Sequence, residues 1–428
     1  MNGLERRSRQ LSPPGMINKS LKELQLRREF SFLQSEMIGQ MDSLRSPISG
    51  LYHNWQDSDG NNSGYSLIPD TAYGMLGELI GFKTGKRTRE DTTSRLALTL
   101  SSLANLNNVN YAGFFPTACE TDTTELIQGD LKIAAVDNVH LFLANIAIGK
   151  ILPELHEETE KINNNMNFSF FLDKNKGLLH GVFDLNKNRF FDYHDGALAS
   201  ETRLAAYVYM VQTGDYSYYN RLLRNIPSEY TDKDLDNRQP QNLKHRPPYQ
   251  TNGGNLFEDA MPTLFFPEEL VSSEWKFQHK EMIAAEREYA HRYSNGIWGH
   301  YPADNPGIGD YEYVMTGIPE LAANSAHVEP DVISPFASLL VTRLSPDKVY
   351  RNLRHFQETY QGIHKCGRGF YDSVKISTGE ISRRYLAINV GTGLVAVSNY
   401  SNDNFIRNTT SEFFEPILPT IAAGNLAY

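Results

Sequence analysis

The chain has 428 residues, an apolar content of 40% and a charged content of 21%, which are ordinary values for a globular protein with a large core. Its formal net charge of −10 argues against nucleic acid or an anionic membrane surface as a partner. The two cysteines, Cys119 and Cys366, can form neither a disulfide framework nor a zinc cluster, and we expect no metal and no cofactor.

The N-terminal stretch is basic and polar, and it lacks the apolar segment of a secretory signal. We expect residues 1–17 to be a disordered lead. We also expect the protein to be cytoplasmic, or periplasmic or secreted if a signal has been removed. No apolar run approaches the 18 residues of a membrane-spanning helix, so membrane insertion is not expected. No linker divides the rest of the chain, and residues 18–428 are predicted to form a single domain.

Helices dominate the first third of the chain. Apolar residues recur at spacings of three and four between Leu26 and Leu44, which predicts a helix that ends at Ser46-Pro47. Alternating Asp, Asn and Ser follow from Asp57, but the twelfth position is Ile68, where a calcium loop needs glutamate. A solvated turn is therefore favoured over a calcium site. Further helices are predicted at about residues 70–82, 89–105 and 137–162.

The middle of the chain mixes short strands with helices. Residues 168–172 and 179–185 have the composition of two strands around a hairpin-type turn. The stretch 192–205 begins as a turn and continues into an alanine-rich helix, with Glu201 on its first turns. Residues 226–250 are rich in Pro, Asp, Asn and Lys and are predicted to be an irregular surface excursion.

The last third returns to helices and loops. We predict a charged helix at 274–292, an aromatic loop at 296–304, helices at 329–342 and from Ser345, a loop at 367–372, and two helices flanking Asn402. Helix pairs separated by polar, aromatic loops indicate an all-α toroid. We expect short β hairpins and long loops at its cleft end.

Acidic residues recur beside Tyr, Trp, His and Gly in loops at helix starts. Glycoside cleavage needs this chemistry, because one carboxylic acid protonates the leaving oxygen while a second carboxylate activates water or attacks carbon. The candidates are Asp137, Asp195, Glu201, Glu258, Asp304, Glu312 and Asp372. Each is equally compatible with a helix cap or a surface charge. A helix dipole would lower the pKa of Glu201, so an acid role requires burial or an anionic neighbour.

Several segments occur in a distinctive order over about residues 45–410. They are Gly113-Phe-Phe through Ala134-Ala-Val-Asp137-Asn, Asp192-Tyr-His-Asp through Ser200-Glu-Thr-Arg-Leu-Ala, Gly253-Gly-Asn-Leu-Phe-Glu-Asp-Ala-Met-Pro, Trp298-Gly-His-Tyr-Pro-Ala-Asp304, Ser334-Pro-Phe-Ala-Ser, Gly369-Phe-Tyr-Asp and Leu386-Ala-Ile-Asn-Val-Gly. In this order they resemble the glucoamylase-like family that contains the bacterial β-1,2-glucanases and the middle domain of cyclic β-1,2-glucan synthases.

This resemblance implies an (α/α)6 toroid and an inverting endo-β-1,2-glucanase acting on an oligo- or polysaccharide. Carried over residue by residue, Glu201 is the expected acid, and Asp137 and Asp304 are the expected base or water-positioning groups. The implied substrate-binding residues are Asp195, Arg203, Glu258, Trp298, His300, Tyr301, Tyr371, Asp372 and Asn389. The family's synthase-type Ser-Glu-Ser is replaced here by Tyr301-Pro-Ala, which favours inverting hydrolysis over a retaining, synthase-like mechanism.

Other functions fit the same residues. A toroid with the altered Tyr301-Pro-Ala loop would also serve as a non-catalytic glycan-binding protein. A transglycosylase or a polysaccharide lyase on this fold is a further alternative. The lyase would need a base beside a cation that neutralises a uronic acid, and His194 with Arg203 is the pair that the sequence offers.

Overall fold

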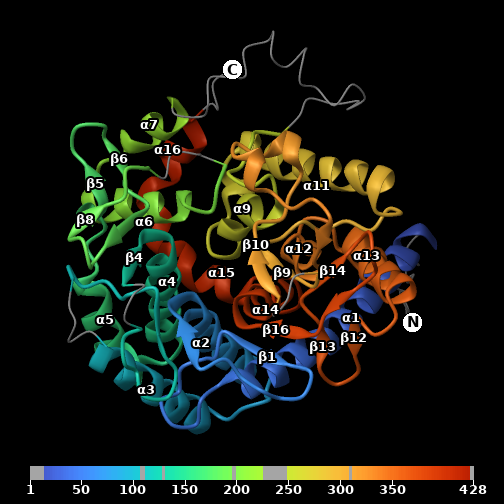
Figure 1. Ribbon diagram of the computed structural model, residues 1–428, viewed down its shortest axis with the longest axis horizontal. Helices are drawn as coiled ribbons and strands as arrows, with labels where there is room; N and C mark the ends of the chain where they lie inside the picture. Colours follow the sequence, from blue (N-terminus) through green and yellow to red (C-terminus); the bar gives the residue numbers. More distant parts are fainter. Residues whose placement is uncertain are drawn as a thin grey trace, which may run out of the picture.

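The computed structural model describes residues 14–106, 111–127, 131–194, 199–224, 248–307 and 311–424. Within these ranges, six inner helices alternate along the chain with six outer helices and form a closed ring (Figure 1). The inner helices are α2 (Ile68–Lys83), α4 (Ala135–Ile151), α6 (Arg203–Thr213), α9 (Leu256–Ala260), α12 (Pro335–Leu340) and α14 (Ala387–Ser401). The outer helices are α1 (Pro14–Leu44), α3 (Arg89–Leu106), α5 (His156–Asn165), α7 (Tyr218–Arg224), α11 (Ser273–Tyr293) and α13 (Pro346–Thr359).

The ring closes where α14 packs against α1 and α2, so the last inner helix meets the first. Close approach there depends on glycine, because a Cβ built at Gly391 would lie 2.4 Å from Cβ of Tyr73. Short helices α10 (Glu268–Val271), α15 (Phe405–Thr410) and α16 (Leu418–Ala423) fill gaps between the pairs. The buried apolar side chains of the ring form one continuous cluster. The predicted all-α toroid is confirmed.

Short antiparallel strands lie in the loops that join the helices. The paired sets are β1 (Trp55–Asp57) with β16 (Arg384–Leu386), β2 (Tyr65–Leu67) with β3 (Ala118–Glu120), β5 (Leu172–Asp173) with β6 (Leu178–Leu179), β9 (Ala303–Asn305) with β10 (Glu312–Val314), and β12 (His364–Lys365) with β13 (Gly369–Phe370). Two sets have three strands: β4 (Lys132–Ala134), β7 (Val182–Asp184) and β8 (Arg189–Phe190), and β11 (Val332–Ile333), β14 (Ser373–Lys375) and β15 (Ile381–Ser382).

Three of these strands lead directly into inner helices. β2 ends at the residue before α2, β4 at the residue before α4, and β16 at the residue before α14. The side chain at the third helical position is Asp70 in α2, Asp137 in α4 and Asn389 in α14. A role as N-cap, which the sequence allowed for Asp137, is therefore wrong by three residues, because the N-cap position of α4 is Ala134 at the end of β4.

Several predicted boundaries differ from the structure for local reasons. The predicted helix 137–162 is two helices, α4 and α5, because Pro153 begins a separate 3-10 turn between them. Residues 168–171 form a 3-10 turn rather than a strand. The helix expected from residue 329 begins only at Pro335, after strand β11. Of the predicted lead, residues 14–17 open α1 and residues 1–13 lie outside the described residues, as does most of the predicted excursion 226–250.

Among the described helices, none combines the length and the apolar character that crossing a bilayer requires.

Candidate active site

The first turns of the inner helices bring carboxyl groups together at one end of the ring. Glu201 lies in the turn that precedes α6, and Glu258 occupies the third position of α9. The charge of Glu201 acts on both Asp137 and Glu258, and the charge of Asp137 acts on Asp70. Four inner helices or their leading turns therefore contribute to one acidic cluster.

Asp304 and Asp372 form a second acidic pair on the strands of the cleft end. β9 and β14, which carry or adjoin them, lie near the middle of the ring in Figure 1. The amide of Asp304 donates to Asp372 Oδ2 at 2.8 Å, and Asn389 Nδ2 donates to Asp372 Oδ1 at 2.6 Å. Arg384 Nη1 lies 3.8 Å from Asp304 Oδ2. The pair is thus tied to α14 on one side and to a cation on the other.

Hydrogen bonds fix the orientation of the remaining carboxyl groups. Asp70 Oδ2 accepts from Asn54 Nδ2 and from the amide of Leu67, both at 3.0 Å. Glu258 Oε2 accepts from the amide of Gly253 at 2.7 Å. Glu201 Oε2 accepts from the Ser200 hydroxyl at 2.7 Å. These bonds hold the oxygens in place before any ligand is present, which favours a binding or catalytic site.

Burial raises the pKa of every carboxyl group in the site. It raises the pKa of Glu201 and, with help from the Glu201 charge, that of Glu258 to about 8. Burial and then Glu201 raise the pKa of Asp137 to about 6. Burial raises the pKa of Asp304 to about 7 against the opposing effect of Arg384. The site therefore holds protonated and ionised carboxyl groups side by side near neutral pH, which general acid–base chemistry requires.

Exposure separates the carboxyl groups that a ligand can reach from those that support them. Asp137 and Glu201 are half-buried. Glu258 and Asp372 are fully buried, and Asp304 retains only 3% of its surface. Glu201 and Asp137 are therefore the two groups most open to a ligand.

Aromatic side chains surround Arg384 at the edge of this acidic cluster. The Arg384 guanidinium lies 4.0 Å from the ring centre of Trp55 and 5.1 Å from that of Tyr311. Tyr313 is 52% exposed and pairs with Asp304 across β9 and β10. Partial burial, then the charges of Asp70 and Asp304, raise the pKa of Tyr65, so its hydroxyl group lies within reach of the charges of the cluster. We call Trp55, Tyr65, Tyr311 and Tyr313 the aromatic rim.

Sequence reasoning gave none of these rim residues a role. The available signal was the spacing of Tyr311 and Tyr313, which puts two aromatic rings on one face of an extended segment. What it could not reveal is that β1 pairs with β16 and so brings Trp55 to Arg384.

Four predicted sugar contacts are corrected by the structure. The Arg203 side chain is fully buried and binds Glu268. Trp298 is 3% exposed, and its backbone exchanges two hydrogen bonds with Asn352 of the outer helix α13. His300 is held between Glu286 and the carbonyl of Pro330, and Tyr371 stacks on Tyr385 at 4.7 Å. These four side chains are buried and make contacts within the protein, so they are not accessible to a sugar.

Other predicted residues are placed as follows. Tyr301 is fully buried, and its hydroxyl group is hydrogen-bonded to Thr392, although the charges of Asp372 and Glu201 reach it. Asn389 and Asp372 lie together in the site, and Asn389 Oδ1 has no hydrogen-bond partner among the described residues. Glu312 lies on β10 and is exposed. Asp195 lies outside the described residues.

The sequence is similar to that of known proteins. The family model described as "Putative glucoamylase" matches residues 208–412. The cyclic beta-(1,2)-glucan synthase NdvB of Rhizobium meliloti (strain 1021) is 25% identical over 301 residues, which is 68% of this chain. This chain spans only 10% of that relative's length. The resemblance to the glucoamylase-like family is thereby confirmed.

Two solved structures share the fold. The endo-beta-1,2-glucanase from Chitinophaga pinensis, in complex with sophorotriose and glucose, has a TM-score of 0.71 at 15% identity, over 92% of this chain and 97% of that one. The endo-beta-1,2-glucanase from Talaromyces funiculosus, in complex with sophorose, has a TM-score of 0.67 at 14% identity, over 93% of this chain and 90% of that one.

Proposed function

We propose, from the glucoamylase-like match and the shared toroid, that this protein is a glycoside hydrolase that cleaves a β-1,2-linked glucan within its chain and with inversion. The names of the relatives support the linkage, since the synthase and both glucanases are named for β-1,2-glucans. The chemistry rests on this protein's own carboxyl groups. The observation that carries the proposal is the pairing of two accessible carboxyl groups, Glu201 and Asp137, with raised pKa values.

Glu201 acts as the general acid in this proposal. Burial favours its neutral form, and the Ser200 hydroxyl fixes one of its oxygens. A protonated carboxyl group in this position can give its proton to the glycosidic oxygen as the bond to the anomeric carbon breaks. The proton lost in that step must return from solvent before the next turnover.

Asp137 acts as the base that activates the attacking water. Its pKa of about 6 lies below those of Asp304 and Glu258, so Asp137 is ionised at neutral pH while Glu258, with a pKa of about 8, keeps its proton. Asp304 is the second candidate, because Arg384 favours its ionised form. Azide supplied to a variant without the base can replace the activated water. Asp137→Asn and Asp304→Asn can be compared in this way.

The aromatic rim holds the glucan. Exposed Tyr313 and half-buried Trp55 present ring faces, and sugar rings present apolar faces that stack on them. Asn389 Oδ1, which has no hydrogen-bond partner in the described part of the chain, offers an acceptor for a sugar hydroxyl, because a buried acceptor without a partner is unfavourable until a ligand supplies one.

The test is digestion of linear β-1,2-glucan followed by NMR that resolves the anomers of the first products. We expect oligosaccharides of mixed length whose new reducing ends are initially α. Products that are initially β would refute inversion. Tight binding without any cleavage would instead identify a non-catalytic glycan-binding protein. β-1,3- and β-1,6-glucans serve as controls for the linkage.

The lyase alternative loses its support in this structure. Its cation would be Arg203, but that guanidinium is saturated by Glu268 and by the carbonyl groups of Ser200, Glu258 and Asp259. Its base would be His194, whose Nε2 is bonded to Asp173. The Arg203 guanidinium is therefore not available to neutralise a uronic acid.

A further inference from the structure

Two histidines and an aspartate meet on the hairpin that precedes the Glu201 turn. Asp173 ends β5, His180 follows β6, and His194 lies opposite His180 in an antiparallel bridge. In the described part of the chain, this is the only group of three or more His, Cys, Asp or Glu side chains whose ligand atoms all lie within 4.8 Å of one another. The proposed glycosidase chemistry uses none of them.

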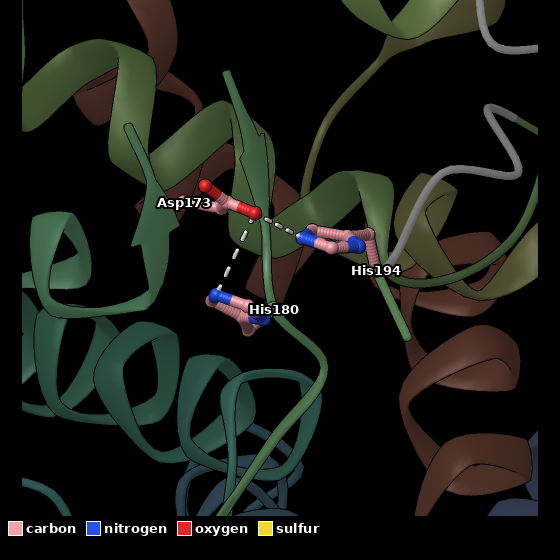
Figure 2. Close-up of side chains that lie close together, drawn as sticks. All are labelled: Asp173, His180 and His194. Atoms are coloured by element: carbon pink, nitrogen blue, oxygen red, sulfur yellow. Dashed lines mark hydrogen bonds and ion pairs between the residues drawn. The ribbon is translucent and has the colours of Figure 1, made fainter. Parts of the chain in front are cut away.

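The two imidazole rings face the same carboxylate oxygen. His194 Nε2 lies 2.8 Å from Asp173 Oδ2, and His180 Nε2 lies 4.0 Å from that atom (Figure 2). A hydrogen bond explains the first contact, but 4.0 Å is too long for the second. Two ligands of a tetrahedral zinc ion lie about 3.3 Å apart, given metal–ligand distances of about 2.0–2.1 Å. The two observed separations lie on either side of that value.

The surrounding contacts prepare each group for coordination. Asp173 Oδ1 accepts the backbone amides of Asn175 and Lys176 at 2.8 and 3.3 Å, which fixes the carboxylate and leaves Oδ2 directed at the rings. His180 stacks on Phe190 at 4.3 Å and lies 4.5 Å from the His194 ring, so both rings are held side by side.

We propose that Asp173, His180 and His194 bind one divalent transition metal ion of the kind that prefers imidazole, such as Zn²⁺. Three protein ligands leave at least one position for water. His194 precedes Glu201 by seven residues, so the ion would fasten the start of the segment that leads to Glu201 onto the β5–β6 hairpin. This site does not depend on the proposed glucanase activity.

The experiment measures uptake of Zn²⁺ by the full chain after treatment with EDTA and gel filtration, using isothermal titration calorimetry and elemental analysis. We expect one ion per chain. Co²⁺ bound in its place should give the visible absorption bands of a site with low coordination number. Thermal melting with and without Zn²⁺ provides a second readout, because a ligand that binds only the folded state raises Tm.

Substitutions test the ligands one at a time. His180→Asn, His194→Asn and Asp173→Asn should each weaken Zn²⁺ binding by at least about 10-fold, since even outer-shell partners contribute that much. Asp173→Asn keeps an oxygen that accepts from the Asn175 and Lys176 amides, so this variant should retain the turn. It therefore still tests the site if a histidine variant fails to fold. His156→Asn is the matched control, because His156 has a single carboxylate neighbour, Glu160, at 3.2 Å.

The site is supported if all three ligand variants weaken Zn²⁺ binding and His156→Asn leaves it unchanged. Absence of stoichiometric uptake by the wild-type chain overturns it. An unchanged affinity for Zn²⁺ after either histidine substitution in a folded variant also overturns it, because the proposed site requires both rings.

Discussion

The charge of Glu201 reaches both Asp137 and Glu258, and its own oxygen is fixed by Ser200. A carboxyl group near the start of a helix would ordinarily be more acidic than a free one, because the dipole favours its charge. Here burial acts in the opposite direction and raises the pKa of Glu201. An acid at this position requires burial or an anionic neighbour to raise its pKa, and burial provides that effect for Glu201.

Replacement of Glu201 by glutamine should lower kcat on β-1,2-glucan by about 10²–10⁴-fold, the usual contribution of a general acid. The amide keeps the shape of the side chain but has no acidic proton. Reducing-end release measures kcat, and circular dichroism checks the fold. Glu157→Gln, on the outer helix α5, is the control and should retain full activity. Full activity in Glu201→Gln would exclude Glu201 as the acid.

At the scale of single elements, the β9–β10 hairpin carries an acid and an aromatic ring in register. Tyr313 faces Asp304 across the two strands and keeps 52% of its surface exposed. An exposed ring beside a buried carboxyl group can hold a sugar without taking part in proton transfer. Substrate binding and chemistry are therefore assigned to different residues of one hairpin.

Tyr313→Ala should raise KM roughly fivefold with little change in kcat, because loss of one stacked ring removes about 1 kcal/mol of binding. Tyr313→Phe should behave like the wild type, since it keeps the ring. Tyr293→Ala removes an equally exposed tyrosine from the outer helix α11 and should have no effect. Steady-state kinetics on β-1,2-glucan separate KM from kcat; a fall in kcat alone would contradict a stacking role.

Helix α6 is joined to α9 and α10 through Arg203. Its guanidinium binds Glu268 of α10 and the carbonyl groups of Ser200 and Glu258, and it lies 4.4 Å from the ring of Trp275. It thereby supports the backbone beside two carboxyl groups of the site. The sequence interpretation of Arg203 as a sugar ligand missed this internal role.

Arg203→Leu should lower the free energy of unfolding by about 3–5 kcal/mol, because it breaks a buried ion pair and leaves the Glu268 charge with only His279 and Tyr207 as polar partners among the described residues. The exposed pair of Arg89 and Glu154 is the control, and Arg89→Leu should change stability by about 1 kcal/mol or less. Urea unfolding followed by circular dichroism gives both values. Equal effects of the two substitutions would contradict a structural role for the buried ion pair of Arg203 and Glu268.

The whole molecule carries several carboxyl groups whose pKa values rise on folding, with Glu258 at about 8 and Asp304 at about 7. Their values in the unfolded chain are about 4.3 and 3.9. Between these limits the folded protein binds more protons than the unfolded chain. These two groups therefore contribute stability at low pH that is lost as pH rises through their folded pKa values.

We expect Tm to be higher at about pH 5.5, which lies between the unfolded and folded pKa values of both groups, than at about pH 8, which is at or above both folded values. Glu258→Gln cannot titrate and should reduce this difference, because it removes a carboxyl group whose pKa is raised to about 8 in the folded protein. Melting curves in a series of buffers test this, with Glu157→Gln as an exposed control. An unchanged pH dependence in Glu258→Gln would refute the raised pKa.

Many helices of the ring can be predicted from the sequence, because helix formation depends on residues a few positions apart. Apolar spacing predicted α1, α2, α3 and α11 to within a few residues, and the final pair of helices around Asn402. Acidic residues near the starts of α4, α6 and α9, namely Asp137, Glu201 and Glu258, were candidates from the sequence, and the ring brings them together. The split between α4 and α5 was missed although Pro153 marks it.

Exposure, by contrast, was decided by tertiary structure. Trp298 and Trp55 both lie in polar, aromatic segments, yet Trp298 is buried against α13 and Trp55 borders the site because β1 pairs with β16. Arg203 and Arg384 are equally charged in the sequence, but one is enclosed by α9 and α10 and the other faces the aromatic rim. The sequence by itself determined the helical ring and its acidic helix starts, because spacing and local chemistry act over a few residues. Only the packing of segments hundreds of residues apart decided which of those side chains meet water.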